Sequence, residues 1–317
     1  VPYAVFENNL WMPLEADSEI SHITQAKMDL LGVTLDKDEG LGDSNWDPHH
    51  MGPLMVKKAV SYIQTHAGDE KPFFMYYCSQ AVHLPHTPPD SLNGIPIAGT
   101  TPSKHMDMIK ELDVQMGMII QTLKDQSIYN NTLIIFTSDN GGLLRSETLR
   151  SGHQPSSIYR GGKNSRFEGG HRVPFIVSWP DEIVPQQSSQ EPVLGLDIMA
   201  TLAGITGAEI GTGQAMDSHN LLPILKNQAE AKSHSFLMLQ SGTGKELMII
   251  EDGWKLIIQV DKTGTIREPI ALFDLNTNLC EDESLNYIHH PAHQQKIDDL
   301  FAKYNQVRDS RIPTRSY

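Results

Sequence analysis

Three stretches of the chain carry side chains that could act together on a charged substrate. The first contains His83, the second contains the neighbouring pair Asp139 and Asn140, and the third contains Lys163. Carboxylate and amide oxygens are ligands that calcium or magnesium prefers. An ammonium group can hold an anion, and an imidazole can transfer a proton near neutral pH. These residue types together indicate a pocket for a tetrahedral anion beside a divalent cation.

Each of these residues has a simpler interpretation when it is taken alone. Asp139 and Asn140 begin the run Asp-Asn-Gly-Gly, which is also ordinary turn chemistry and could be a capped loop without an ion. A single His is more often structural, and a Lys in a Gly-rich loop usually lies in solvent. The chemical interpretation therefore requires a fold that brings the three stretches together.

The elements around these stretches predict an α/β domain. Apolar runs predict strands at 131–137, 73–78 and 175–180, the first of them buried on both faces. Apolar residues at helical spacing predict helices at about 54–68 and 103–126. Alternating helices and strands favour a mainly parallel, mixed sheet flanked by helices. The three chemical stretches then lie in loops at the ends of three predicted strands, and strand ends are where open α/β sheets usually bind their ligands.

The sequence pattern changes after residue 230. Short helices are predicted before this point, at 196–205 and 221–225. Beyond it, short apolar segments separated by glycines predict a small antiparallel sheet with strands at 236–239, 247–250, 254–258 and 271–274. A helix predicted from about 291 to 307 follows the sheet. We expect residues 1–230 to belong to the main domain and residues 231–317 to form a smaller C-terminal subdomain.

The beginning of the chain is unusual for such a domain. Residues 1–50 show no sustained hydrophobic period and predict no strand. Structureless segments of this length are uncommon in compact domains, so we expect the chain to start inside a domain.

Composition restricts the class of partner and the role of the cysteines. The formal charge of −14 over 317 residues argues against a nucleic-acid backbone as partner. No apolar run has the length needed to cross a membrane, and no targeting signal is visible. Cys78 and Cys280 are too few for a disulfide framework and too far apart for a metal knuckle, which predicts two buried thiols.

Taken together, the motifs resemble the type I sulfatases, the calcium-dependent arylsulfatase-like branch of the alkaline phosphatase superfamily. The matching segments occur in the family's order from about residue 55 onward. They are Pro72-Phe73-Phe74-Met75-Tyr76, His83-Leu84-Pro85-His86, Phe136-Thr137-Ser138-Asp139-Asn140-Gly141-Gly142, Arg160-Gly161-Gly162-Lys163, Glu168-Gly169-Gly170-His171-Arg172-Val173-Pro174, Asp197-Ile198-Met199-Ala200-Thr201-Leu202 and Leu272-Phe273-Asp274-Leu275.

The resemblance implies a role for each residue of the constellation. Asp139 and Asn140 would be ligands of one calcium ion. Lys163 would hold a sulfate oxygen and offset the charge that develops on it. His83 would contact the ester oxygen and protonate the leaving group, or hydrogen-bond to it.

Two further histidines are candidates for substrate binding. His86 would line the substrate side, with a structural role as the alternative, and His153 would touch substrate unless it is simply exposed to solvent. Glu168 and Arg172 are expected to form an internal ion pair that shapes their loop.

The chain departs from the family pattern in its missing nucleophile. Type I sulfatases carry a Cys- or Ser-x-Pro-x-Arg signature, whose first residue becomes formylglycine, and further calcium ligands near it. Neither Cys78 nor Cys280 stands in such a signature. We expect the formylglycine upstream of this chain, which would correspond to the C-terminal two-thirds of the family. The 317 residues alone should then turn over sulfate esters negligibly.

Two other functions stay open at the sequence level. One is a phosphate mono- or diester hydrolase of the same superfamily, and the other is a non-catalytic module that binds sulfated glycans. The expected substrate is a sulfated small molecule or carbohydrate. By resemblance, the expected location is secreted, periplasmic or lysosomal, and the oligomeric state is not predicted.

Overall fold

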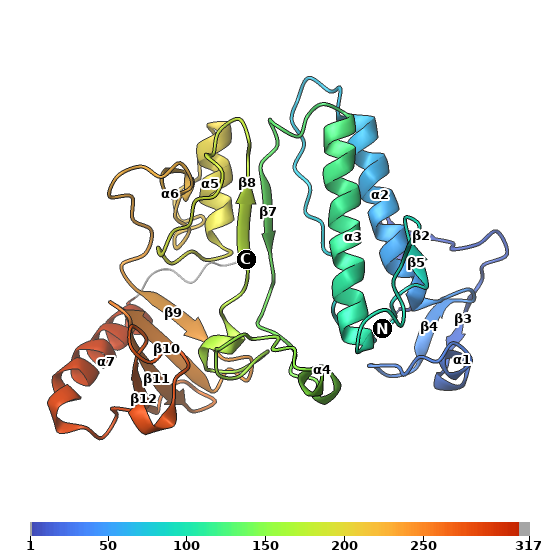
Figure 1. Cartoon of the computed structure of the whole chain (residues 1–317). Coiled ribbons are helices and arrows are strands. Elements are labelled where there is room, and N and C mark those ends of the chain that lie inside the picture. Colours follow the sequence, from blue (N-terminus) through green and yellow to red (C-terminus); the bar gives the residue numbers. More distant parts are fainter. Residues whose placement is uncertain (1, 311–317) are drawn as a thin grey trace. The chain divides into compact units, whose positions relative to one another are not determined.

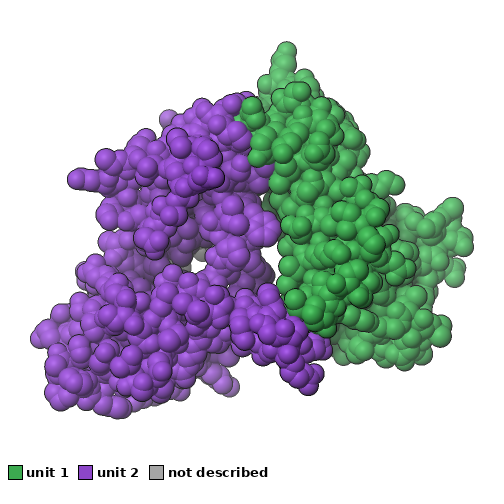
Figure 2. Space-filling view, in the orientation of Figure 1, with its two compact units in different colours: residues 1–130 green, residues 131–317 purple. Residues whose placement is uncertain are grey.

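The structure is a computed structural model that describes residues 2–310. The chain forms two compact units, residues 1–130 and residues 131–317, which Figure 2 shows in different colours. The domain boundary expected near residue 230 stays a prediction.

Two long helices dominate the first unit. Helix α2 spans Met51–His66 and helix α3 spans Lys104–Asp125. They lie side by side in Figure 1 and pack against each other. The Ser103 side chain accepts a hydrogen bond from a main-chain N–H of the first turn of α3, which fixes where this helix begins. Both helices are confirmed within a few residues of the positions that apolar spacing predicts.

The prediction that residues 1–50 contain no strand is wrong. The structure has two short antiparallel strand pairs and one short helix there, with the bounds β1 Val5–Glu7, β2 Leu10–Met12, β3 Ile20–Ile23, α1 Gln25–Asp29 and β4 Gly40–Asp43. A small core of Tyr3, Ile23, Met28 and Val33 holds this part together. Strands of three or four residues are too short to show the alternation that identifies longer ones.

The prediction of a strand at residues 73–78 is also wrong. These residues form neither helix nor strand, and the next strands are the short pair β5 Ser91–Leu92 and β6 Ile95–Pro96. Phe74 is 67% exposed and Tyr76 is 81% exposed. An apolar run predicts a buried strand only where a neighbouring strand pairs with it, and none of the described residues forms a ladder with this segment.

In the second unit, β7 Ile134–Thr137 pairs with β8 Phe175–Ser178. Both strands are confirmed, but two details of the prediction are corrected. The strand before Asp139 is half-buried instead of buried on both faces. The pair is antiparallel, and every ladder between named strands in residues 2–310 is antiparallel. The β7–β8 connection, residues 138–174, contains the short helix α4, Ser146–Arg150, and a 3₁₀ turn at Glu168–Gly170.

Two short helices follow β8. Helix α5 spans Asp197–Thr206 and ends at Gly207, whose φ of +70° lies in the left-handed region that favours glycine. Helix α6 spans Leu222–Leu225. Both confirm the sequence prediction.

The C-terminal sheet is antiparallel, as predicted, with the strand order β12-β11-β10-β9. Its strands are β9 Leu237–Gln240, β10 Glu246–Glu251, β11 Trp254–Val260 and β12 Arg267–Asp274. The terminal helix α7, Gln294–Asp309, packs on one face, where Ile297, Leu300 and Tyr304 meet buried residues of the sheet (Figure 1). On the sheet's second buried cluster, Phe167 from the long β7–β8 connection packs beside Phe273.

Two remaining predictions concern the cysteines and the membrane. Cys78 and Cys280 are free, but both are exposed, so the prediction of buried thiols is wrong. None of the described helices combines the length and the hydropathy of a membrane-crossing segment.

The packing of α7 on the sheet gives a stability prediction. Leu272 is fully buried there, so Leu272→Ala should lower the free energy of unfolding by about 2–5 kcal/mol through lost burial and the cavity left behind. Ile266 is 69% exposed, and Ile266→Ala should cost less than about 0.5 kcal/mol. Urea unfolding of both variants checks this, and equal losses would contradict the assignment of the core.

Candidate functional site

The turn after β7 presents two oxygen-bearing side chains. The Asn140 amide donates a hydrogen bond to Asp139 Oδ1 at 2.5 Å, and the Ser138 hydroxyl donates to the Asn140 carbonyl at 3.0 Å. Among the described residues, none donates a hydrogen bond to Asp139 Oδ2 or Asn140 Oδ1. Each side chain therefore keeps one oxygen available for a ligand.

Glycines let the loop that carries Lys163, residues 160–172 and called the Lys163 loop below, lie directly against this turn. The Lys163 N–H donates to the Gly142 carbonyl at 2.9 Å, and the Gly141 N–H donates to the Gly170 carbonyl at 3.0 Å. A Cβ atom at Gly141 would overlap the carbonyl group of Gly169. Only glycine permits this backbone approach, so the Asp-Asn-Gly-Gly run is more than a generic turn.

The charges around Lys163 single out its ammonium group. Three arginines of the loop are paired with carboxylates: Arg160 with Glu283 at 2.8 Å, Arg166 with Glu246 at 3.6 Å, and Arg172 with Glu168 at 2.6 Å. The last pair confirms the internal ion pair predicted from the sequence. Lys163 is half-buried, and its ammonium is paired with none of the residues 2–310. It is therefore the cation of this loop that can take an anionic ligand.

A buried ion cluster lies behind the loop. Lys255 on β11 is fully buried, and its Nζ lies 2.8 Å from Glu168 Oε1 and 2.8 Å from Glu281 Oε1. The Glu168 N–H also donates to Glu281 Oε2 at 2.5 Å. Sequence analysis missed Lys255, although a charged residue inside the apolar run Trp254–Ile258 was a visible signal.

The pKa values of the two carboxyl groups of this cluster shift in opposite directions. Burial tends to raise the pKa of Glu168, but the ammonium of Lys255 and the guanidinium of Arg172 bring that pKa below its ordinary value. Burial raises the pKa of Glu281, and Lys255 offsets this only in part. The difference arises because Glu168 has a second cation and Glu281 does not.

The imidazole of His83 lies in the first unit and is exposed. Its Nδ1 lies 2.8 Å from the Leu84 carbonyl oxygen, and its main-chain N–H donates to the Gln80 carbonyl at 2.9 Å. Because a carbonyl can only accept, Nδ1 carries the hydrogen in that bond. The other nitrogen, Nε2, is then the one that gains or loses a proton.

The two candidate substrate-binding histidines occupy different settings. The His86 ring stacks on the buried His105 ring in the first unit, with 5.1 Å between centroids. His153 is half-buried in the second unit, just after α4. Two residues later, Pro155 packs against Gly142, where a Cβ atom would lie 2.6 Å from the Pro155 carbonyl oxygen.

The structure thus brings together the segments that carry three of the four residues of the predicted constellation. Asp139, Asn140 and Lys163 lie on segments that bond to each other within the second unit. His83 and His86 belong to the first unit, so their place beside the other three stays a prediction.

The Asp139–Asn140 turn offers the type of ligand that calcium prefers, but fewer ligands than a calcium ion needs. Calcium takes about six to eight oxygen ligands, and this turn offers carboxylate and amide oxygens. Across residues 2–310, no group of three or more His, Cys, Asp or Glu side chains is arranged so that it could hold a metal ion by itself. The turn can therefore supply only part of a calcium site.

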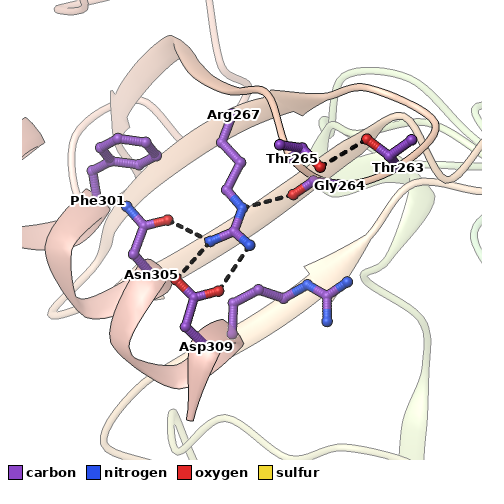
Figure 3. Close-up of a pocket in the computed structure, with 8 residues that line it drawn as sticks. Thr263, Gly264, Thr265, Arg267, Phe301, Asn305 and Asp309 are labelled. Carbon is purple, nitrogen blue, oxygen red and sulfur yellow. Dashed lines mark hydrogen bonds and ion pairs between the residues drawn. The ribbon is translucent and has the colours of Figure 1, made fainter.

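An open hollow elsewhere in the second unit is a weaker candidate. It has a volume of about 580 Å³ and lies between the β11–β12 turn and α7 (Figure 3). The Arg267 guanidinium lies among the side chains that line the hollow. It already donates hydrogen bonds to Asn305 and Asp309, at 2.8 Å each. With its principal cation already paired, the hollow offers less to an anion than Lys163 does.

The close glycine contact gives a prediction for the site. Gly141→Ala should lower the free energy of unfolding by about 1–3 kcal/mol, because the new methyl group must displace the backbone at Gly169. Gly195→Ala is the matched control in the same unit, since a Cβ atom there meets nothing within 4 Å. Urea unfolding should separate the two variants, and a neutral Gly141→Ala would refute the tight contact.

His171 gives a pH prediction for the same loop. Burial and then Lys255 lower the pKa of His171, and its Nε2 is buried without a hydrogen-bond partner among the described residues. The unfolded chain therefore binds a proton at about pH 6.5 where the folded one does not, so stability should fall as pH drops through that value.

The measurement is urea unfolding from about pH 7.5 to about pH 5.5, in the wild type and in His171→Gln. The variant should lose less stability over this range than the wild type. An identical pH dependence in both proteins would show that His171 is not held neutral.

Comparison with known proteins identifies the family of the chain. The family model described as Sulfatase matches residues 40–208, which is more than half of the 317 residues. An N-acetylgalactosamine-6-O-sulfatase of Bacteroides thetaiotaomicron is 31% identical over 271 residues, covering 80% of this chain and 51% of that protein. A steryl-sulfatase of Rattus norvegicus is 32% identical over 194 residues, covering 58% of this chain and 33% of that protein. The chain thus spans about half of the first relative and a third of the second.

A solved structure from Bacteroides thetaiotaomicron, described in connection with the metabolism of multiple glycosaminoglycans, is also similar. It is 26% identical with a TM-score of 0.80, and the match covers 97% of this chain and 70% of that one. The predicted alkaline phosphatase-like α/β fold, with its C-terminal antiparallel sheet and helix, is confirmed. The chain belongs to the sulfatase family.

Proposed function

We propose that this chain provides the sulfate-binding half of the active site of a sulfate-ester hydrolase. The observation that supports this most directly is the bonding of the Lys163 loop to the Asp139–Gly142 turn. Lys163 is the one cation of this loop without a partner among the described residues. The turn bonded to its loop carries Asp139 Oδ2 and Asn140 Oδ1, two oxygens that accept no hydrogen bond from these residues.

Each residue of the turn and loop has a distinct part in this proposal. Asp139 and Asn140 hold calcium through their available oxygens. Calcium, when bound, polarises a sulfate oxygen as a Lewis acid. Lys163 binds another sulfate oxygen, and its ammonium is worth most as negative charge grows there in the transition state.

His83 completes the proposal as the proton donor. With Nδ1–H bonded to the Leu84 carbonyl, the proton that can leave an imidazolium is the one on Nε2. That proton would go to the ester oxygen as its bond to sulfur breaks. The His83 imidazole is exposed, so a substrate oxygen has access to it.

The nucleophile is proposed to lie outside these 317 residues. No Cys- or Ser-x-Pro-x-Arg signature occurs in the sequence, and positioning alone cannot replace a nucleophile. The formylglycine and the remaining calcium ligands would come from a segment upstream of residue 1. The chain alone should then bind part of the transition state but turn over little substrate.

The proposed substrate is a sulfated carbohydrate, with an amino sugar sulfated at the 6-position as the first to test. The Bacteroides relative is named for that specificity, and it matches 80% of this chain. His153 and His86 are proposed to contact the sugar. The proposed location remains secreted, periplasmic or lysosomal.

The test joins the chain to the formylglycine-bearing segment of the Bacteroides relative and measures hydrolysis of 6-O-sulfated N-acetylgalactosamine. Lys163→Met should lower kcat/KM by about 10²–10³-fold, because it removes a charge that acts on the transition state. Lys245→Met is the control, since Lys245 is exposed on the β9–β10 turn and should leave kcat/KM unchanged. A calcium chelator should abolish turnover in the wild type.

Two results would contradict the proposal. Hydrolysis by the 317 residues alone would show that the nucleophile lies within them. Equal activities of Lys163→Met and the wild type would show that the ammonium does not act on sulfate.

A further inference from the structure

The Lys163 loop is held from two sides within the second unit. On one side, its backbone bonds to the Asp139–Gly142 turn. On the other side, it reaches the C-terminal sheet, where Glu168 meets the buried Lys255 of β11. The loop therefore connects the proposed sulfate site to a sheet that contributes no residue to that site.

The contacts with the C-terminal part are numerous and specific. The Arg160 guanidinium donates to the Glu281 carbonyl at 2.9 Å and lies 3.8 Å from the centre of the Phe167 ring. Phe167 in turn packs against Phe273 of β12. The Gly242 N–H donates to the carbonyl of Asn164, the residue after Lys163, at 3.2 Å.

Lys255 is the centre of these contacts. Alternation along β11 puts it on the same face as Ile257, toward the second buried cluster of the sheet. Its fully buried ammonium donates a hydrogen bond to one carboxylate of the loop, Glu168, and forms an ion pair with one of the segment after β12, Glu281. A buried Lys is costly unless it is paired, and apolar side chains would fill this space at lower cost. A directional ion cluster can select one register of loop against sheet, which an apolar contact does less specifically.

We propose that Lys255 is a positioning residue for Lys163. Through Glu168 and Glu281 it holds the loop in the register in which the Lys163 N–H donates to the Gly142 carbonyl of the Asp139–Gly142 turn. Lys255 touches neither the turn nor the sulfate. The inference rests on the proposed function only in the identity of the ligand that Lys163 takes.

A purely structural role for Lys255 makes a different prediction. If the cluster only stabilised the C-terminal sheet, its loss would loosen β10, β11 and β12 together. If it positions the loop, its loss should loosen residues 160–172 and the Asp139–Gly142 turn while the strands stay protected. Amide hydrogen exchange separates these cases residue by residue.

The first test is hydrogen exchange in Lys255→Met, followed by NMR. The amides of Gly141, Lys163 and Gly169 donate the hydrogen bonds within the loop and between the loop and the turn. In the variant these amides should exchange at least about 10-fold faster than in the wild type. The amides of the β10–β11 ladder should change less than about twofold. Lys303→Met is the matched control, since Lys303 pairs with Glu251 on the same sheet without touching the loop.

A milder variant covers the case in which Lys255→Met does not fold. Glu281→Gln keeps an oxygen that can accept a hydrogen bond from the Glu168 N–H, but it removes the negative charge that pairs with the Lys255 ammonium. Loop amides should exchange at least about threefold faster, again without change in the strands. Glu251→Gln removes the same charge from the Lys303 pair and should leave the loop unchanged.

Activity adds a second measurement in the enzyme assembled with the formylglycine segment. Glu281→Gln should lower kcat at least about 10-fold with KM changed less than about threefold, because a displaced Lys163 is missed most in the transition state. If the wild type is inactive, the proposed function fails, and the exchange data still decide the inference. Unchanged loop exchange in both variants, or equal acceleration in loop and strands, would overturn it.

Discussion

The close approach of Gly141 to the Gly169 carbonyl is the contact on which the candidate site depends. It lets the backbone of the Lys163 loop bond to the turn that carries Asp139 and Asn140. A flexible lysine at the end of an unsupported loop would spend little time near these oxygens. Two main-chain hydrogen bonds and a glycine contact confine the Lys163 backbone, so that its side chain starts from a fixed point.

The charge pattern of the same loop explains why Lys163, and not an arginine, is available. Each neighbouring arginine has a carboxylate partner, and two of these partners belong to the C-terminal part, Glu283 and Glu246. The buried Lys255 adds a third connection, through Glu168. The C-terminal sheet therefore neutralises and shapes the loop around its one available cation. In this view the sheet is part of the active-site support, although it supplies no reacting group.

Much of this arrangement could be predicted from the sequence, and the failures have physical causes. Helices α2, α3 and α7 follow from apolar spacing, because each buries one face along several turns. The strand at 73–78 could not be decided in this way, since an apolar run does not say whether a partner strand lies beside it. The Glu168–Arg172 pair was visible from local spacing, whereas the Lys255–Glu168 pair joins residues that are 87 positions apart in the sequence.

A crystal structure of this chain joined to the proposed formylglycine-bearing segment, with calcium and a sulfate ester analogue, would locate the proposed contacts. We expect a calcium ion about 2.3–2.6 Å from oxygens of Asp139 and Asn140. We also expect one oxygen of the anion within hydrogen-bond distance of Lys163 Nζ, and the ester oxygen within reach of His83 Nε2. An ion bound elsewhere, or a His83 imidazole on a face remote from Lys163, would refute the proposed site.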